Sequence, residues 1–129
     1  MIELSEADVK RGCEDYLEVM KAQRKLIYFR LNAGDFIDTR GGSRRRIKGA
    51  GAGTADLIVI QPGQVHLEYM KKQQGPGIPV AFTTFIECKS SKGKLRKEQL
   101  EFSEMVKNLH CKYVVVRNVD DLVAALERE

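Results

Sequence analysis

Near the start of the chain, hydrophobic residues recur at the three- and four-residue spacing of a helix, so one helical face carries them all. The positions are Val9, Cys13, Tyr16, Leu17 and Met20. Ser5 stands just ahead of this stripe, with Asp8 three residues further on, which is the pattern of a capping box at a helix N-terminus. The pattern predicts a first helix that begins near Ser5.

Two segments in the first half have the composition of strands. Residues 26–31 are aromatic and β-branched, and they end at the turn signal Asn32-Ala33-Gly34. Residues 56–60 are apolar on both alternating faces after their first residue, as a central strand covered on both sides is. We expect Gln61-Pro62-Gly63 to end that strand.

Residues 65–70 are a candidate for a short returning strand, and residues 83–89 predict the next core strand. Because side chains alternate along a strand, Phe85, Glu87 and Lys89 share one face. Two charged side chains therefore point the same way from a strand that is otherwise apolar.

The last third of the chain continues with a helix over residues 96–109, a strand over 113–117 and a capped terminal helix over 118–127. The predicted order of elements is α-β-β-β-α-β-α.

A chain of 129 residues with 43% hydrophobic and 31% charged residues fits a single globular domain over residues 1–129. No apolar run approaches the roughly 20 residues of a membrane span, and the start of the chain lacks a signal-peptide pattern. We therefore expect a cytoplasmic protein with no membrane partner. Cys13, Cys88 and Cys111 form no C-x-x-C pair, which favours reduced thiols over a disulfide framework or a zinc site.

The positive charge lies in two short segments that contain no acid. The first holds Arg40, Arg44, Arg45, Arg46 and Lys48, and the second holds Lys89, Lys92, Lys94, Arg96 and Lys97. Without these ten bases, the chain has 12 bases against 18 acids. Such a division fits a phosphate polyanion as partner, although charge runs are also common on solvated faces. The first segment lies in a glycine-rich stretch with one large apolar residue, which predicts a flexible basic loop at about 40–53.

Charged residues on core strands cost free energy unless they bind something. Asp56 and Glu87 on neighbouring strands would repel each other unless a hard cation lay between them, and oxygen ligands of this kind suit Mg²⁺ or Mn²⁺. Lys89 could then orient a water that attacks a phosphodiester. The simpler interpretation is an ion pair between Glu87 and Lys89 at the edge of the sheet.

Two further polar residues lie on apolar helical faces. Gln99 falls inside the stripe of its helix, where it either completes a site or bonds to the backbone as an ordinary buried amide. Glu6 lies on the same face as Val9, whereas Glu14 is expected to point away. Glu6 is therefore the better candidate for a third carboxylate, unless it only complements the helix dipole.

Several short motifs occur in a fixed order over nearly the whole chain. They are Glu6 with Val9 and Leu17, Arg30-Leu31-Asn32-Ala33-Gly34, Gly53-Thr54-Ala55-Asp56-Leu57-Ile58-Val59-Ile60, Ile86-Glu87-Cys88-Lys89, Gly93-Lys94-Leu95 before Gln99 and Phe102, and Val115-Val116-Arg117. Together they resemble the VRR-Nuc branch of the PD-(D/E)XK nuclease superfamily. Where the family name records V-R-R, this chain has Val116-Arg117-Asn118.

The resemblance implies a restriction-endonuclease-like α/β (α+β) fold with a central, mixed, four-stranded sheet flanked by helices. It implies that Asp56, Glu87 and the backbone carbonyl of Cys88 hold Mg²⁺ or Mn²⁺, with Lys89 beside the attacking water. Gln99 and Glu6 would complete the catalytic site. Small members of the family resemble Holliday junction resolvases, which implies a homodimer because a four-way junction needs two symmetric cuts. The residues expected to bind DNA are Arg30, Asn32, Arg40, Arg44, Arg45, Arg46, Lys48 and Lys92.

The function expected from these residues and from the resemblance is a metal-dependent, structure-selective DNA endonuclease. Two alternatives stay open at this point: a DNA-binding module that does not cleave, and a nuclease that acts on RNA, because contacts to phosphate serve either polymer.

Overall fold

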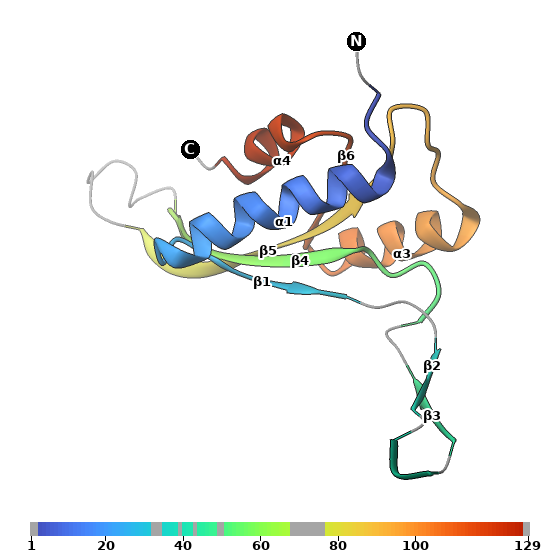
Figure 1. The fold of residues 1–129 in the computed structure, drawn as a ribbon. Coiled ribbons are helices and arrows are strands. Elements are labelled where there is room, and N and C mark those ends of the chain that lie inside the picture. Colours follow the sequence, from blue (N-terminus) through green and yellow to red (C-terminus); the bar gives the residue numbers. More distant parts are fainter. Residues whose placement is uncertain are drawn as a thin grey trace.

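The structure is a computed structural model that describes residues 3–31, 35–38, 40–42, 44–48, 51–67 and 77–127. For residues 35–38, 40 and 45–48 only the backbone is described. A four-stranded sheet of strand order β1-β4-β5-β6 forms the centre of the molecule (Figure 1). Its strands are β1 (Ile27–Arg30), β4 (Leu57–Val65), β5 (Ile78–Cys88) and β6 (Lys112–Val116). β1 pairs antiparallel with β4, and β4 with β5, whereas β6 runs parallel to β5, so the predicted mixed sheet is confirmed.

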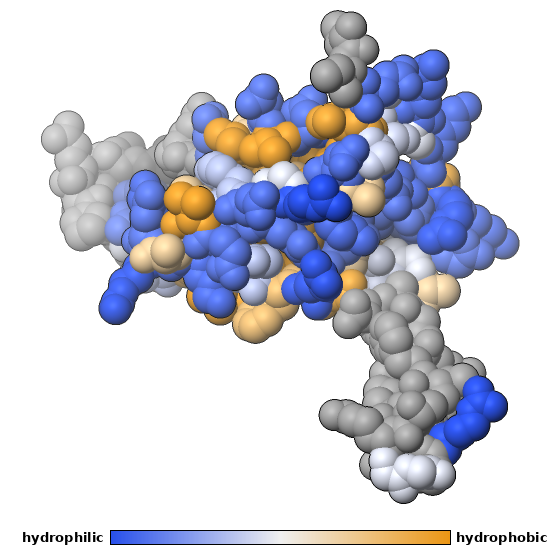
Figure 2. Space-filling model, viewed as in Figure 1, coloured by the Kyte–Doolittle hydropathy of each residue, from blue (hydrophilic) through white to orange (hydrophobic). Residues whose placement is uncertain are grey.

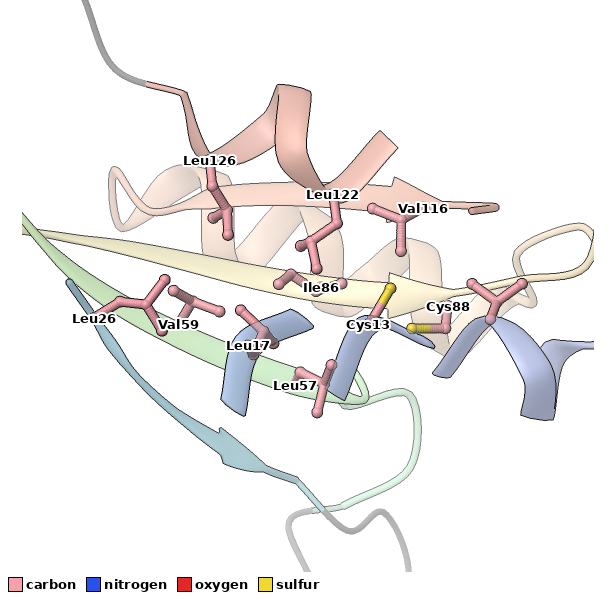
Figure 3. Close-up of a cluster of buried hydrophobic side chains, with 11 residues drawn as sticks. Cys13, Leu17, Leu26, Leu57, Val59, Ile86, Cys88, Val116, Leu122 and Leu126 are labelled. Carbon is pink, nitrogen blue, oxygen red and sulfur yellow. The ribbon is translucent and has the colours of Figure 1, made fainter. Parts of the chain in front are cut away.

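The helices α1 (Glu6–Ala22) and α4 (Val119–Leu126) cover one face of this sheet (Figure 1). Alternate side chains of the strands meet them in a continuous apolar core (Figure 3). The core contains Val9, Cys13, Leu17, Leu26, Leu57, Val59, Ile86, Cys88, Val116, Leu122 and Leu126. The predicted capping box opens α1, because Ser5 Oγ accepts from the Asp8 N–H and Asp8 Oδ2 accepts from the Ser5 N–H.

The opposite face of β5 and β6 packs against α3 (Lys97–Asn108). Phe102 of α3 lies edge-on to Phe85 of β5 and to Tyr113 of β6, with ring centroids 5.4 and 6.2 Å apart. Because neighbours in a strand point to opposite faces, Phe85 faces α3 while Ile86 faces the core beneath α1. The predicted alternation in this strand is therefore confirmed.

The strands β4 and β5 form a longer hairpin than the sequence predicts. β4 continues through Pro62 and Gly63 to Val65, so the predicted strand end at residue 61 is wrong. The predicted separate strand over 65–70 is also wrong, because Val65 belongs to β4 and residues 66 and 67 are in no strand; residues 68–70 lie outside the described residues. Likewise β5 begins at Ile78 and not at 83. The physical reason is that β1 pairs with β4 only as far as Ile60, so Pro62 lies in a stretch whose other side has no β1 partner.

The basic segment contains regular structure that the sequence did not predict. The strands β2 (Asp35–Asp38) and β3 (Arg45–Lys48) pair in an antiparallel hairpin, with the short 3-10 helix η1 (Arg40–Gly42) between them. Backbone ladder bonds need no large apolar core, and the register still sets Phe36 opposite Ile47. In Figure 1 this basic hairpin projects away from the four-stranded sheet. The flexibility of residues 40–53 stays a prediction.

Seen from the side of α1, the surface of the helices and the sheet is mostly hydrophilic (Figure 2). Among the described residues, no helix is long and apolar enough to cross a bilayer.

Candidate functional site

The two carboxylates singled out in the sequence lie together at one end of the sheet. The register that pairs Leu57 with Ile86 brings Asp56, just before β4, beside the last residues of β5. Asp56 Oδ2 accepts a 2.8 Å hydrogen bond from the Cys88 N–H, and its carbonyl accepts one of 2.8 Å from the Leu31 N–H. Asp56 is therefore held by both neighbouring segments, and its side chain is 17% exposed.

Glu87 is buried next to this aspartate, with 3% of its surface exposed. Its Oε1 has no hydrogen-bond partner in the structure. Burial first, and then the hydrogen bond with Asp56 and the charge of Asp56, raise the pKa of Glu87 from 4.5 to about 8, although Lys89 opposes this shift. Without a cation, Glu87 is thus protonated at neutral pH, as expected for one of two carboxyls that share a site.

Lys89 follows β5 directly and is also buried, at 7% exposed. Its backbone N–H donates to the Val116 carbonyl over 3.0 Å, which fixes the main chain at the end of β6. Its Nζ lies 3.6 Å from Oε1 of Glu6, the first residue of α1. Among the ion pairs of the described residues, none joins Lys89 to Glu87, so the simple pair at the sheet edge is not what the structure contains.

Glu6 and Glu14 both lie on the flank of α1 that faces the end of the sheet. Glu6 is half exposed and reaches Lys89. Glu14 does not point away, which corrects the expectation: its two oxygens each accept a 2.8 Å hydrogen bond from Arg30 of β1, and only 18% of its side chain is exposed. On a helical wheel Glu14 is about 60° from Leu17, and β1 packs against that side. The Arg30 guanidinium lowers the pKa of Glu14.

Lys10 belongs to the site, although the sequence did not single it out. Its Nζ lies 3.1 Å from Oδ1 of Asp56. Burial opposes the charge of Lys10, but the hydrogen bond with Asp56 and its negative charge outweigh that effect and raise the pKa of Lys10. The available signal was spacing: Glu6, Lys10 and Glu14 are four residues apart on one helix. This stripe, with Arg30, lines a hollow of about 380 Å³.

Tyr113 of β6 is a second residue that the sequence did not single out. Its hydroxyl is buried and lacks a hydrogen-bond partner in the structure. Burial first, followed by the charges of Glu87 and Asp56, raises the pKa of Tyr113, so this phenol is neutral at physiological pH. It lies on the face of the sheet that packs against α3.

Gln99 and Cys88 have clear structural roles. Gln99 is buried, and its Oε1 accepts a 2.8 Å hydrogen bond from the Arg96 N–H, so it caps α3. The Cys88 thiol lies in the core, where it points toward Cys13 (Figure 3). The hydrogen bond that the Cys88 thiol donates to Cys13, together with burial, raises the pKa of Cys88 and keeps its thiol neutral. The backbone of Cys88, in contrast, reaches the site through its N–H bond to Asp56.

Of the residues expected to bind DNA, Arg30 lies at this end of the sheet. Arg30 ends β1 opposite Leu57, so the chain leaves for the basic hairpin next to Asp56. Arg44 is exposed, and Lys92, with 86% of its side chain exposed, lies 3.6 Å from Glu3. For Arg40, Arg45, Arg46 and Lys48 only the backbone is described, and Asn32 lies outside the described residues.

The donor set fits a hard divalent cation. Within the described part of the chain, no group of three or more His, Cys, Asp or Glu side chains is arranged to hold a metal ion. Mg²⁺ is commonly held by only one or two carboxylates, with water and substrate phosphate as its other ligands. Asp56 and Glu87 provide two carboxylates, and Oε1 of Glu87 has no hydrogen-bond partner, so it is free to coordinate a cation.

Comparison with protein-family models, curated proteins and solved structures finds no match to this chain. The chemistry of the site therefore has to be inferred from its own residues.

Proposed function

We propose that this protein is a metal-dependent nuclease that hydrolyses phosphodiester bonds in DNA, with a restriction-endonuclease-like fold of the VRR-Nuc kind. The observation that carries the proposal is the buried Glu87, which has an unpartnered carboxyl oxygen beside Asp56. Two carboxyls at the same end of two central strands cost stability in a folded protein, and a divalent cation would offset that cost.

Asp56 and Glu87 would hold Mg²⁺ or Mn²⁺. When bound, such a cation stabilises negative charge on the scissile phosphate and makes water a better nucleophile at neutral pH. Lys89 would donate a hydrogen bond to the attacking water and offset charge on the phosphate, since its ammonium is held in the same cluster by Glu6. Gln99 contributes indirectly, because it caps the helix that covers this face of β5.

DNA is the substrate favoured by the charge distribution. The basic hairpin leaves the sheet at the Asp56 end, and Lys92, Lys94, Arg96 and Lys97 follow Lys89 along the chain, so both basic segments adjoin the carboxylates. We also propose a preference for branched DNA and a homodimer, since paired cuts need two sites. The edge strand β1, with Ile27 and Phe29 about half exposed, offers apolar surface for a second copy.

The test is a cleavage assay on labelled duplex, flap, nicked and four-way DNA and on matching RNA, with and without Mg²⁺ or Mn²⁺. Asp56→Asn, Glu87→Gln and Lys89→Met should each reduce the cleavage rate by more than about a hundredfold while DNA binding persists. Glu104→Gln and Lys107→Met change exposed residues of α3 and serve as matched controls.

Three results would contradict the proposal. A folded Asp56, Glu87 or Lys89 variant with a rate within about tenfold of wild type would remove that residue from catalysis. Binding without cleavage under every metal condition would indicate a DNA-binding module, and cleavage restricted to RNA would change the substrate.

A further inference from the structure

Lys89 has a long side chain that must be held in one place to act on a water molecule. A lysine side chain carries about 2 kcal/mol of rotamer entropy, so precise placement needs support from its surroundings. Its contact with Glu6 is long, at 3.6 Å, and Glu6 is itself half exposed. Glu6 therefore supplies only part of the support that Lys89 needs.

The turn that follows Lys89 lies against its side chain. The Gly93 N–H donates to the Ser90 carbonyl over 3.1 Å and closes this turn. The aliphatic stem of Lys89 runs past Gly93: its Cδ and Cβ lie 3.4 and 3.5 Å from the point that a Cβ at Gly93 would occupy. The position of the turn at 90–93 thus limits where the stem of Lys89 can lie.

Arg117 fastens both ends of this turn. It follows Val116, the last residue of β6, and its Nη1 donates to the Ser90 carbonyl over 2.5 Å and to the Gly93 carbonyl over 2.8 Å. Its own backbone is anchored as well, because the Arg117 N–H donates to Oδ2 of Asp121 over 2.9 Å. One half-buried guanidinium therefore connects the start of α4 to the turn beside Lys89.

We propose that Arg117 is a positioning residue, which clamps the 90–93 turn and thereby holds the ammonium of Lys89 at the carboxylate site. The expected effect of Arg117 on the cleavage rate rests on the proposed nuclease function, whereas its effect on the position of Lys89 does not. A planar guanidinium directs two N–H bonds from one nitrogen to two carbonyls in fixed directions, so it pre-organises the turn at a small entropic cost. Without it, the turn can move away and Lys89 gains freedom to turn toward solvent.

The chain offers a matched control at the other end of β6. Lys112 Nζ donates to the Ala125 carbonyl over 2.6 Å, so it also joins β6 to a backbone carbonyl through a cationic side chain. That bond lies at the start of the strand, while Lys89 lies at its end, where its N–H bonds to Val116. Loss of Lys112 removes a bond of the same kind without affecting the turn.

The experiment compares Arg117→Ala, Arg117→Lys and Lys112→Ala by two measurements. The first is NMR of protein labelled with ¹³C at the lysine ε carbon, in which Lys89→Arg identifies the Lys89 signal. The second is single-turnover cleavage with saturating DNA, alongside DNA affinity. Arg117→Ala should move the Lys89 signal toward those of exposed lysines and slow cleavage by at least about tenfold, with DNA affinity unchanged within about twofold. Arg117→Lys should recover part of the rate, and Lys112→Ala should change neither measurement.

An unmoved Lys89 signal in a folded Arg117→Ala protein would overturn the proposal, and so would an equal effect of Lys112→Ala, which would indicate general loss of stability. If Arg117→Ala does not fold, Arg117→Lys decides by the same two measurements. If the wild type cleaves no nucleic acid, the proposed function fails while the NMR measurement still decides whether Arg117 positions Lys89.

Discussion

The buried carboxyl of Glu87 should make the stability of the metal-free protein fall as pH rises. Its pKa is about 8 in the folded protein, against 4.5 for an ordinary glutamate. Between these values the folded state keeps a proton that the unfolded state has lost. Stability from this group is therefore fully present below about pH 4.5 and is lost as pH rises through about 8.

The magnitude follows from the width of this window. One proton changes the free energy of unfolding by about 1.4 kcal/mol per pH unit, so the full window corresponds to a loss of up to about 5 kcal/mol. Solvent screening reduces this little, because Glu87 is only 3% exposed. Glu87→Gln replaces the protonated carboxyl by a neutral amide of similar shape and should remove most of this pH dependence.

The assay is urea unfolding of wild type and Glu87→Gln between about pH 5 and pH 9 with a metal chelator present. The two proteins should be similar near pH 5, and the variant should become more stable by several kcal/mol near pH 8. Glu104→Gln, an exposed change on α3, is the control and should follow the wild type. Parallel curves for wild type and Glu87→Gln would refute the reasoning. Saturating Mn²⁺ should stabilise the wild type more at pH 8 than at pH 5, because at pH 5 it must displace the proton.

Two further changes test the surroundings of the carboxylates. Lys10→Met should tighten Mn²⁺ binding by roughly tenfold in calorimetry, because an ammonium 3.1 Å from Asp56 repels an incoming cation. Arg11→Met changes an exposed residue and is the control. Unchanged Mn²⁺ affinity for Lys10→Met would show that Lys10 does not compete with the cation. Replacing Arg44, Arg45 and Arg46 by alanine should flatten the slope of log affinity against log salt by up to about 3 units on duplex and four-way DNA, and an unchanged slope would remove the basic hairpin from the binding surface.

The parts of the fold that local patterns determine could be predicted from the sequence. The capping box at Ser5 and the apolar stripe of α1 are properties of one helix, and both are confirmed. The predicted end of β4 at residue 61 and the predicted start of β5 at residue 83 were wrong, because pairing between β4 and β5 overrides the local turn signals. A proline can lie in a strand where its missing N–H would face no neighbouring strand. The sequence alone does not show which stretch of a strand lacks such a neighbour.

The site could be predicted only in part for a related reason. Asp56 and Glu87 could be predicted because charge on an apolar strand is unusual, and the register of β4 and β5 does bring them together. Lys10 drew none, because a lysine on an amphipathic helix is usually solvated; only the packing of α1 against the end of the sheet brings it to Asp56. Gln99 lies on the apolar face as predicted, and the structure shows the ordinary alternative, a bond to the backbone.

Charge balance connects these residues to the cation. In the metal-free protein, the two carboxyls are neutralised by a proton on Glu87 and by the ammonium of Lys10 beside Asp56. Together these provide two positive charges, the same as one divalent cation. A cation at this site would therefore release about one proton and free Lys10 without changing the net charge in the interior. Lys10 would then lie beside a hollow that opens next to the site, where its charge can meet a phosphate of the substrate. Binding of the metal and of DNA would accordingly favour each other, because both draw Lys10 away from Asp56.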